Sequence, residues 1–418
     1  MHHFTYKNGE LYAESVPVKD IAEAVGTPCY IYSHATLVRH FNVFDGAFSK
    51  IPHLICYSVK ANSNLAILRL MAKLGSGMDV VSGGELFCAL AAGADPDKIV
   101  FSGVGKTREE IEYALKTGIL MFNVESEQEL ELIHTCAKEL RKTASIALRV
   151  NPDIDPKTHP YVSTGLKRDK FGINIDKAEM LYQEATKMSC LNVIGIDCHI
   201  GSQLTLLPPF LEAAKQIKNL FNALKEKGIN LKYIDLGGGL GIPYHEERPP
   251  HPYEYANAIL ELAKDIGCTL ILEPGRVIVG NAGILLTKIL YFKKMAEKNF
   301  IIVDAGMNDL VRPSLYNAYH AIWPCAKKER PSIVADIVGP VCESGDFFAK
   351  DREIETVNPG EFLGIMSSGA YGFSMGSNYN CRSRPAEVLV KEEKFWIIRE
   401  RESYKNLISL ERIPEWLK

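Results

Sequence analysis

The chain has 418 residues, of which 46% are hydrophobic and 24% are charged, and its formal net charge is −3. This composition is typical of a folded soluble protein and excludes a disordered, collagenous or membrane-embedded chain. No dense run of basic residues occurs, so nucleic acid is not expected as a partner, and the length favours two domains over one.

The ten cysteines are widely spaced. They form neither a C-x-x-C pair nor the paired Cys/His spacing of a zinc site, so no bound metal is expected. Reduced thiols are typical of the cytosol. The N-terminus lacks the charged and apolar regions of a signal peptide, and no uncharged stretch is long enough to span a bilayer. We therefore expect a cytoplasmic protein without a membrane partner.

Between residues 54 and 276, short apolar runs alternate with longer segments of helical periodicity. The runs are rich in β-branched residues and show little polar alternation, which predicts parallel strands buried on both faces. The eight expected strands span residues 54–60, 77–82, 98–103, 120–126, 146–152, 195–202, 233–239 and 270–276. Helices, several opened by Ser, Thr or Pro, are expected at residues 82–92, 108–116, 125–141, 209–227 and 253–266.

Eight β/α units are the number found in a (β/α)8 or TIM barrel. Polar residues gather where the expected strands end, which is the face on which such barrels carry their active sites. An open doubly wound sheet would be expected to carry a G-x-G-x-x-G turn after its first strand, and none occurs there. The pattern therefore favours a barrel domain over residues 33–278.

After residue 278 the pattern changes to strand-like runs without regular helices. These runs lie at residues 284–292, 300–304, 332–338, 361–366, 387–390 and 395–399. They predict a mostly antiparallel β-sandwich or β-barrel domain over residues 279–418. Residues 1–32 are also strand-like, and we assign them to this β domain rather than to the barrel.

Two charged groups stand out at strand ends: Lys60 follows the first apolar run, and Glu273-Pro274-Gly275-Arg276 follows the last. A lysine removed from water becomes nucleophilic toward an aldehyde, a carboxylate can keep a pyridine nitrogen protonated, and an arginine can face a phosphate. Together they suggest pyridoxal phosphate (PLP) held as a Schiff base. Taken singly, Lys60 could face solvent, and Glu273 could pair with Arg276.

Two further strand ends could contribute to the same pocket. His199 and Ser202 close the sixth strand, where His199 could stack on a cofactor ring or simply be hydrogen-bonded in the core. The three glycines at 237–239 close the seventh strand and could either bind an anion through their N–H groups or make a tight turn. One pocket explains these residues better than four separate coincidences.

The second domain offers polar loops that could hold a substrate. Cys342 and Glu343 lie in a glycine-bounded loop, Arg312 and Tyr316 lie in a short motif, and Tyr371 follows Ser368-Gly369-Ala370. Each could be an ordinary exposed loop. Together they would supply a cation, an anion, a proton donor and two phenols for a zwitterionic substrate.

Eight segments are similar to motifs of known enzymes: residues 57–62, 79–85, 199–203, 237–239, 273–276, 312–316, 342–346 and 369–372. On these segments the chain resembles the diaminopimelate decarboxylase family. That family lies in the alanine-racemase-like (fold-type III) group of PLP enzymes, which also holds ornithine and arginine decarboxylases. The resemblance covers nearly the whole chain. It implies a PLP-binding barrel, a β domain that includes the N-terminal segment, and a homodimer with active sites shared across the interface.

The resemblance also implies a role for each matching residue. Lys60 would form the Schiff base, with the acid Asp79 near it; His199 would stack on the ring. Glu273 would pair with the pyridine nitrogen. The residues expected around the phosphate and substrate are Ser202, Gly239, Gly275 and Arg276, with Tyr371 also reaching the cofactor. The expected substrate-binding residues are Arg276, Arg312, Tyr316, Glu343 and Tyr371.

The expected proton donor is Cys342, reaching in from the neighbouring subunit. Diaminopimelate carries a second amino-acid head, and Arg312 and Glu343 could bind its carboxylate and amine. Ornithine decarboxylases have an aspartate after the reactive cysteine, whereas this chain has Glu343. The resemblance therefore implies decarboxylation of meso-2,6-diaminopimelate to L-lysine and CO2, the last step of lysine biosynthesis.

Three alternatives remain at this point. The chain could decarboxylate another basic amino acid, of the ornithine or arginine type. It could be an alanine-racemase-like enzyme, which would use a catalytic tyrosine from the second domain. A non-catalytic relative is disfavoured because Lys60 and Cys342 are both present. The segment 152–168, rich in Pro, Asp, Lys and Thr, is expected to close over the substrate.

Overall fold

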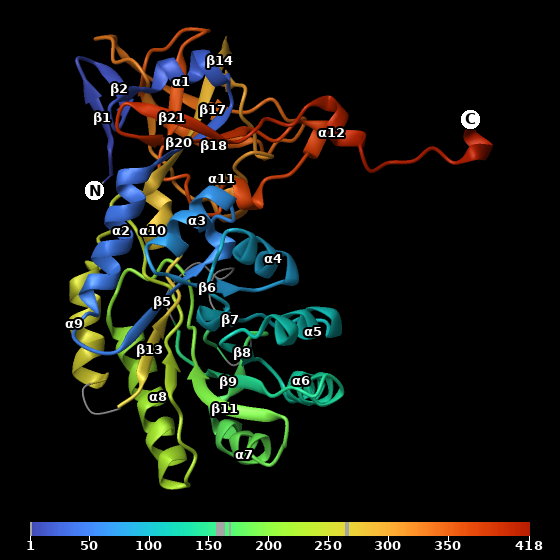
Figure 1. Ribbon diagram of the computed structural model, residues 1–418. Helices are drawn as coiled ribbons and strands as arrows, with labels where there is room; N and C mark the ends of the chain where they lie inside the picture. Colours follow the sequence, from blue (N-terminus) through green and yellow to red (C-terminus); the bar gives the residue numbers. More distant parts are fainter. Residues whose placement is uncertain (1, 156–163, 167–168, 264–266) are drawn as a thin grey trace. The chain divides into compact units, whose positions relative to one another are not determined.

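The computed structural model describes residues 2–155, 164–166, 169–263 and 267–418. The chain divides into two compact units (Figure 1). One unit is Val38–Ile278, and the other combines Met1–Leu37 with Val279–Lys418. Among the described residues, no helix has both the length and the apolar character needed to cross a membrane.

The unit Val38–Ile278 is a parallel barrel, which in the described part of the chain has eight strands around its wall. The hydrogen-bonded order is β9 (Ala144–Asn151), β11 (Leu191–Asp197), β12 (Tyr233–Asp235), β13 (Thr269–Leu272), β5 (His53–Ser58), β6 (Gly77–Val80), β7 (Ile99–Phe101) and β8 (Met121–Val124). The barrel closes because β8 pairs with β9. The short β10 (Ile173–Asn174) adds to β9. The predicted (β/α)8 barrel is confirmed.

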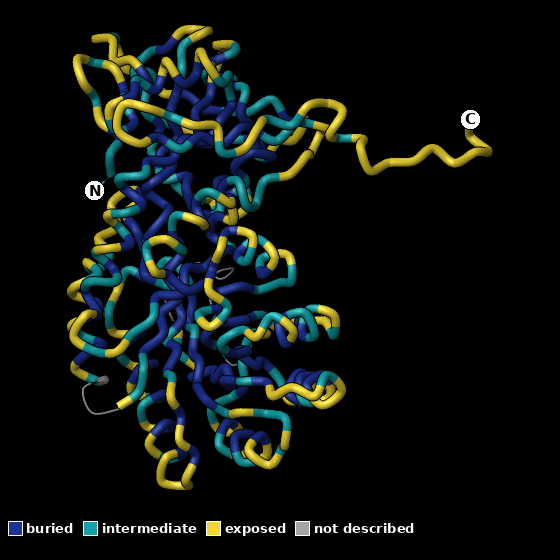
Figure 2. The backbone as a smooth tube through the Cα atoms, viewed as in Figure 1, coloured by how far each residue is buried: buried dark blue, intermediate teal, exposed yellow. Residues whose placement is uncertain are grey.

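Helices alternate with the barrel strands along the chain, and α2 precedes the first of these strands. They are α2 (His34–Ala47), α3 (Leu65–Lys73), α4 (Gly83–Ala91), α5 (Arg108–Thr117), α6 (Glu127–Glu139), α7 (Ile175–Ala185), α8 (Pro208–Glu226), α9 (Pro252–Ala263) and α10 (Arg276–Val279). The side chains of Ser82, Thr107 and Ser126 cap α4, α5 and α6 by accepting backbone N–H bonds. Figure 2 shows the barrel strands buried and the outer faces of these helices exposed.

Side chains fill the barrel. Cys56, Val100, Met121, Ala147, Ile194 and Ile271 form a buried cluster. Gly195 belongs to this region, because a Cβ there would lie 3.1 Å from the Cβ of Ala147 and 3.2 Å from the Sδ of Met121. The interior is therefore a packed core rather than a pore, and the polar chemistry is left to the strand ends.

The other unit is built around β14 (Gly283–Lys294), which pairs antiparallel with β4 (Cys29–Ser33), β15 (Asn299–Val303) and β19 (Phe362–Ile365). Its sheet also holds β16 (Ile322–Pro324), β17 (Ser332–Val338), β18 (Phe347–Glu355), β20 (Ala386–Lys391) and β21 (Lys394–Arg399). Among the described pairings of this sheet, β15–β17 and β4–β20 are parallel and the others are antiparallel. The prediction of a mostly antiparallel β domain is confirmed.

The N-terminal segment contributes to this unit directly. Strand β4 lies inside its sheet, between β14 and β20. A separate antiparallel sheet is formed by β1 (Phe4–Lys7), β2 (Glu10–Ala13) and β3 (Val16–Pro17). The helix α1 (Val18–Val25) follows and was not expected from the strand-like sequence. Its Val18 and Ile21 are buried in the same core as Phe4 and Val388.

Several sequence expectations need correction. Lys60 lies not at a strand end but in the 3-10 turn Val59–Ala61 that follows β5. Arg276 begins α10 instead of ending β13. The sequence also missed β16 and β18, together with the short helices α11 (Arg312–Tyr316) and α12 (Tyr404–Ile408). Strand β18 was missed because it is an edge strand of alternating charge at residues 350–355, without the apolar run of a buried strand.

Candidate active site

The Lys60 side chain is held by a buried carboxylate. Its Nζ lies 2.7 Å from Oδ2 of Asp79, a residue of β6 that has no exposed surface. The hydroxyl of Ser58 also lies 2.7 Å from this oxygen, because Ser58 and Asp79 are register partners on β5 and β6. The lysine side chain itself is 36% exposed. The stretch around Lys60 is nearly uncharged in sequence, yet the barrel gives this lysine a counter-ion from the next strand.

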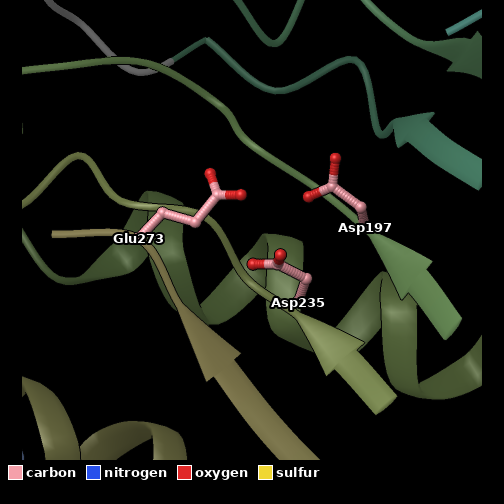
Figure 3. A group of neighbouring side chains, drawn as sticks. All are labelled: Asp197, Asp235 and Glu273. Carbon is pink, nitrogen blue, oxygen red and sulfur yellow. The ribbon is translucent and has the colours of Figure 1, made fainter. Parts of the chain in front are cut away.

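Three carboxyl groups converge at the ends of β11, β12 and β13 (Figure 3). Oxygens of Asp197, Asp235 and Glu273 all lie within 4.8 Å of one another. Asp197 and Asp235 are partners in the barrel register, which forces this approach. Burial and the neighbouring carboxylates raise the pKa of Glu273 and of Asp197 well above their usual range. Because three charges so close repel one another, the cluster binds a proton more tightly than isolated carboxyl groups would.

An amide and a hydroxyl orient Glu273 within this cluster. The Nδ2 of Asn123 lies 3.4 Å from Oε1 of Glu273, 3.4 Å from Oδ2 of Asp235 and 3.1 Å from Oγ of Ser102. The hydroxyl of Ser102 lies 3.4 Å from the same Glu273 oxygen. Sequence reasoning missed Asn123, Ser102 and Asp235. They lie inside the expected strands 98–103, 120–126 and 233–239, whereas the observed strands β7, β8 and β12 end earlier and leave these side chains at or next to the strand ends.

His199 is fixed by the glycine turn after β12. The N–H of Gly238 donates to Nδ1 of His199 at 3.2 Å, which leaves the ring proton on Nε2 in the neutral form. Loss of hydration, together with the charges of Arg149 and Lys60, lowers the pKa of His199 well below its usual value. His199 is therefore a neutral, flat ring at the barrel mouth.

The glycines at 237–239 allow neighbouring groups to pack closely against the backbone of this turn. Gly237 has φ +63°, and a Cβ there would lie 2.6 Å from Nδ1 of His199. A Cβ on Gly239, at φ +107°, would lie 2.5 Å from the carbonyl oxygen of Gly201. One of the N–H groups expected to bind an anion, that of Gly238, is instead used to hold the imidazole.

Arg276 and Ser202 are hydrogen-bonded to each other, and both are side chains that can donate hydrogen bonds to a phosphate. The Nη2 of Arg276 donates to Oγ of Ser202 at 3.1 Å, and Nη1 donates to the hydroxyl of Tyr244 at 2.7 Å. Tyr244 was not found from the sequence. Gly275 allows the end of β13 to approach the lysine turn, because a Cβ there would lie 2.8 Å from the Cβ of Ala61.

The donor set of the barrel fits PLP. It combines a primary amine, a carboxyl group of raised pKa, a neutral aromatic ring and an arginine–serine pair, all after strands of one rim. Oδ1 of Asp79 and Oδ1 of Asp197 are buried and, among the described residues, have no hydrogen-bond partner. A bound group carrying donors suits such a site. The predicted closing segment 152–168 falls largely on residues 156–163 and 167–168, outside the described residues.

In the β unit, Arg312 begins α11 and is buried. Its Nη1 lies 2.8 Å from Nε2 of His320, whose Nδ1 lies 2.8 Å from the carbonyl oxygen of Met366. The Nδ1 must carry the proton to donate to that carbonyl, so Nε2 accepts from Arg312. His320 therefore orients the guanidinium, and no sequence motif had indicated it.

The loop of Cys342 and Glu343 is anchored by Asp346, while both of these side chains are exposed. The carboxylate of Asp346 accepts the N–H of Val341 at 2.6 Å and the N–H of Met307 at 2.6 Å. The hydroxyl of Ser314, in α11, donates to the carbonyl of Gly345.

The β unit therefore ties the Arg312–Tyr316 helix to the Cys342–Glu343 loop, which are separate in sequence. Tyr316 is half-buried. Tyr371 is also half-buried and adopts φ +54°, an uncommon conformation for an aromatic residue.

The comparisons with known proteins agree with one another. A family model described as "Pyridoxal-dependent decarboxylase, pyridoxal binding domain" matches residues 34–280. A Vibrio cholerae protein named diaminopimelate decarboxylase is 51% identical, over 99% of this chain and 100% of the relative.

Two solved structures are also similar over most of the chain. Diaminopimelate decarboxylase from Helicobacter pylori complexed with L-lysine has a TM-score of 0.92 and 45% identity, covering 94% of this chain and 99% of that one. The diaminopimelate decarboxylase from m. jannaschi has a TM-score of 0.95 and 42% identity, covering 100% and 99%.

Proposed function

Because the chain belongs to the diaminopimelate decarboxylase family of pyridoxal-dependent decarboxylases, we propose that it converts meso-2,6-diaminopimelate to L-lysine and CO2. This is the last step of lysine biosynthesis. The observation that carries the proposal is the barrel mouth itself, where Lys60 is paired with Asp79 and Glu273 lies in a carboxyl cluster.

PLP, when bound, supplies an electron sink for the electrons left behind as CO2 departs. Lys60 would bind its aldehyde group, and the imidazole of His199 would lie against the face of its ring. Arg276 and Ser202 would hold its phosphate. Glu273 would face the pyridine nitrogen. The contacts of Arg276 with Ser202 and of His199 with Gly238 support these roles, because each side chain is already oriented.

The chain's own residues control protons at this site. Asp79 places a carboxylate oxygen 2.7 Å from Nζ of Lys60 and so positions the nitrogen that would hold the cofactor's aldehyde. Asp197 and Asp235 help Glu273 to retain a proton that it can share with the pyridine nitrogen. A protonated nitrogen makes the ring the stronger electron sink.

The substrate and proton-donor roles fall on the β unit. We assign the distal head of diaminopimelate to Arg312 and Glu343, with Tyr316 and Tyr371 beside them. Cys342 donates the proton that replaces CO2 and acts at the barrel mouth of a second subunit in a homodimer. The exposure of Cys342 and Glu343 supports this role, because side chains that act on another subunit must project from their own.

Domain organisation and location complete the proposal. Residues 33–278 form the cofactor-binding domain, and residues 279–418 with 1–32 form the β domain; the compact unit Val38–Ile278 supports this division. A cytoplasmic location is supported by the ten cysteines, all of them among the described residues and unpaired.

The test is CO2 release by the purified, PLP-loaded protein with meso-diaminopimelate, run beside ornithine, arginine and lysine. Lysine formation from diaminopimelate, with no release from the other three, is the expected result. Activity with ornithine or arginine alone would overturn the assignment of Arg312 and Glu343. Activity with none of the four, together with racemisation of alanine, would overturn the decarboxylase assignment itself.

A further inference from the structure

One contact to the Cys342 loop comes from a distant part of the β unit. The backbone N–H of Cys342 donates to Oδ1 of Asn380 at 2.8 Å, across 38 positions in sequence. The flanking N–H groups have acceptors within the loop: Val341 donates to Asp346 Oδ2 at 2.6 Å, and Glu343 donates to the carbonyl of Val341 at 2.8 Å. Asn380 is thus the side chain from outside the loop that holds the cysteine's own backbone.

The backbone of the Asn380 turn is unusual. Asn380 adopts φ +55° and ψ 29°, and the next residue, Cys381, adopts φ +53°. Asparagine tolerates this left-handed region better than other residues with a side chain, whereas cysteine does not share that tolerance. Two consecutive non-glycine residues in this region are an unfavourable arrangement of the kind that clusters at functional positions.

Stability alone does not account for the contact. Both Cys342 and Asn380 are exposed, so water would satisfy the cysteine N–H if the amide were absent. Removing the contact therefore changes the folded state little. What the contact provides is a fixed position for the backbone that carries the thiol.

We propose that Asn380 is a positioning residue for Cys342, and that its amide oxygen fixes the point from which the thiol delivers its proton. This inference rests on the proposed function, in which Cys342 is the proton donor. Proton transfer requires hydrogen-bond reach, and a displacement of about 1 Å can lower a rate by about a hundredfold. A loosened Cys342 would reduce turnover without weakening substrate binding.

Three substitutions separate the contact from the backbone strain. Asn380→Ala removes the acceptor oxygen, Asn380→Gly removes it while tolerating the positive φ, and Asn380→Asp keeps an acceptor and tolerates the conformation. We expect Ala and Gly each to lower kcat by about tenfold or more, with KM changed less than about twofold. Asn380→Asp should stay within about threefold of the parent.

The matched control is Asn378→Ala. Asn378 lies in the same segment and donates to Glu402 at 2.7 Å and to the carbonyl of Arg382 at 2.9 Å, not to the Cys342 loop. Its loss should leave kcat at the parent value. Melting temperatures of all variants, measured on PLP-loaded protein, show whether folding has changed.

The second readout does not depend on turnover. Alkylation of Cys342 by iodoacetamide, followed by mass spectrometry of the peptide that carries it, reports how the thiol is held. Asn380→Ala and Asn380→Gly should alkylate several-fold faster than the parent. Asn380→Asp and Asn378→Ala should match the parent.

The inference is overturned if the Ala and Gly variants turn over and alkylate like the parent. It is also overturned if Asn378→Ala reproduces their losses, or if Asn380→Asp fails to rescue them. A separate Cys342→Ala variant tests the proposed function: full activity there removes the proton-donor role. Loss of activity in Cys342→Ala with parent-like Asn380 variants leaves the proposed function intact and overturns the positioning role alone.

Discussion

At the scale of single residues, the site is dominated by shared protons. Glu273 is surrounded by Asp197 and Asp235, so its protonation depends on groups that carry no separate sequence motif. Burial raises the pKa of Asp235 to about 6 from 3.8, although the N–H of Gly237 favours its charged form. Because desolvation destabilises the charged form of these carboxyl groups, a cationic ring placed beside them would shift their protonation strongly toward that charged form.

Removing the Glu273 carboxyl should disable the electron sink. We expect Glu273→Ala to lower kcat by about a hundredfold or more, while some PLP remains bound through Lys60 and Arg276. Steady-state turnover and the cofactor content from absorbance measure both quantities. Glu273→Gln serves as a control that keeps the shape of the side chain but removes its ionisable proton, and full activity in the Ala variant would contradict the assignment.

The raised pKa of Asp235 predicts a pH-dependent stability. Since this carboxyl binds its proton more tightly when folded, its contribution to stability is complete below pH 3.8 and is lost as the pH rises toward about 6. Asn at this position does not ionise. The melting temperature of cofactor-free Asp235→Asn, relative to the parent, should therefore increase from pH 4 to pH 7. A constant difference across this window would argue against a buried ionisation at Asp235.

At the scale of elements, short turns after the strands place the chemistry. The 3-10 turn Val59–Ala61 directs Lys60 toward β6, and Gly275 lets the end of β13 pack on that turn. The turn after β12 packs on the imidazole of His199 through Gly237 and Gly238. The barrel strands form a rigid frame, and the turns after them set the direction in which the side chains of the site project.

This packing can be tested by a pair of glycine substitutions. Gly237→Ala adds a Cβ 2.6 Å from Nδ1 of His199 at φ +63°, whereas Gly228→Ala meets nothing within 4 Å at φ +81°. Gly228→Ala should cost about 1 kcal/mol from backbone strain. Gly237→Ala should cost about 1–3 kcal/mol more and weaken PLP binding. Thermal unfolding and cofactor titration measure the two, and equal effects would show that the imidazole contact is unimportant.

At the scale of the whole molecule, the proposed function divides its groups between two units. The residues assigned to the Schiff base, the ring and the phosphate belong to Val38–Ile278, and the other unit contributes Arg312, Tyr316, Cys342, Glu343 and Tyr371. In the proposal, the exposed Cys342 acts at the barrel mouth of a second copy of the chain, an arrangement that a closed two-fold dimer would supply.

Mixing inactive variants tests the shared site. Lys60→Ala and Cys342→Ala should each be inactive, but mixed dimers contain one site with both native residues. After equal amounts are dissociated and reassociated, about a quarter of the parent activity should return. Each variant reassociated with itself is the control. No recovery, despite mixed dimers seen by mass spectrometry, would show that Lys60 and Cys342 act from the same chain.

Part of this architecture could be predicted from local pattern. The eight barrel strands were located because strands buried on both faces leave continuous apolar runs. Lys60, Glu273 and Arg276 were found because they interrupt or follow those runs. Edge strand β18 left no such run, because it carries alternating charge. Helix α1 does show the apolar spacing of a helix, at Val18, Ile21, Ala22 and Val25, but this short pattern was assigned to the strand-like N-terminal segment around it.

The sequence by itself determined the parallel barrel, the family resemblance and the residues at or just after its strand ends. The apolar runs of buried strands and the residues that make turns can be recognised within short stretches of sequence. Only the tertiary structure decided which of those ends meet. Parallel pairing of β5 with β6 brings Asp79 to Lys60, and pairing of β12 with β13 brings Asp235 to Glu273. The folded β unit brings Asn380 to Cys342. These pairings arise from register and chain reversal between distant segments, which no local pattern encodes.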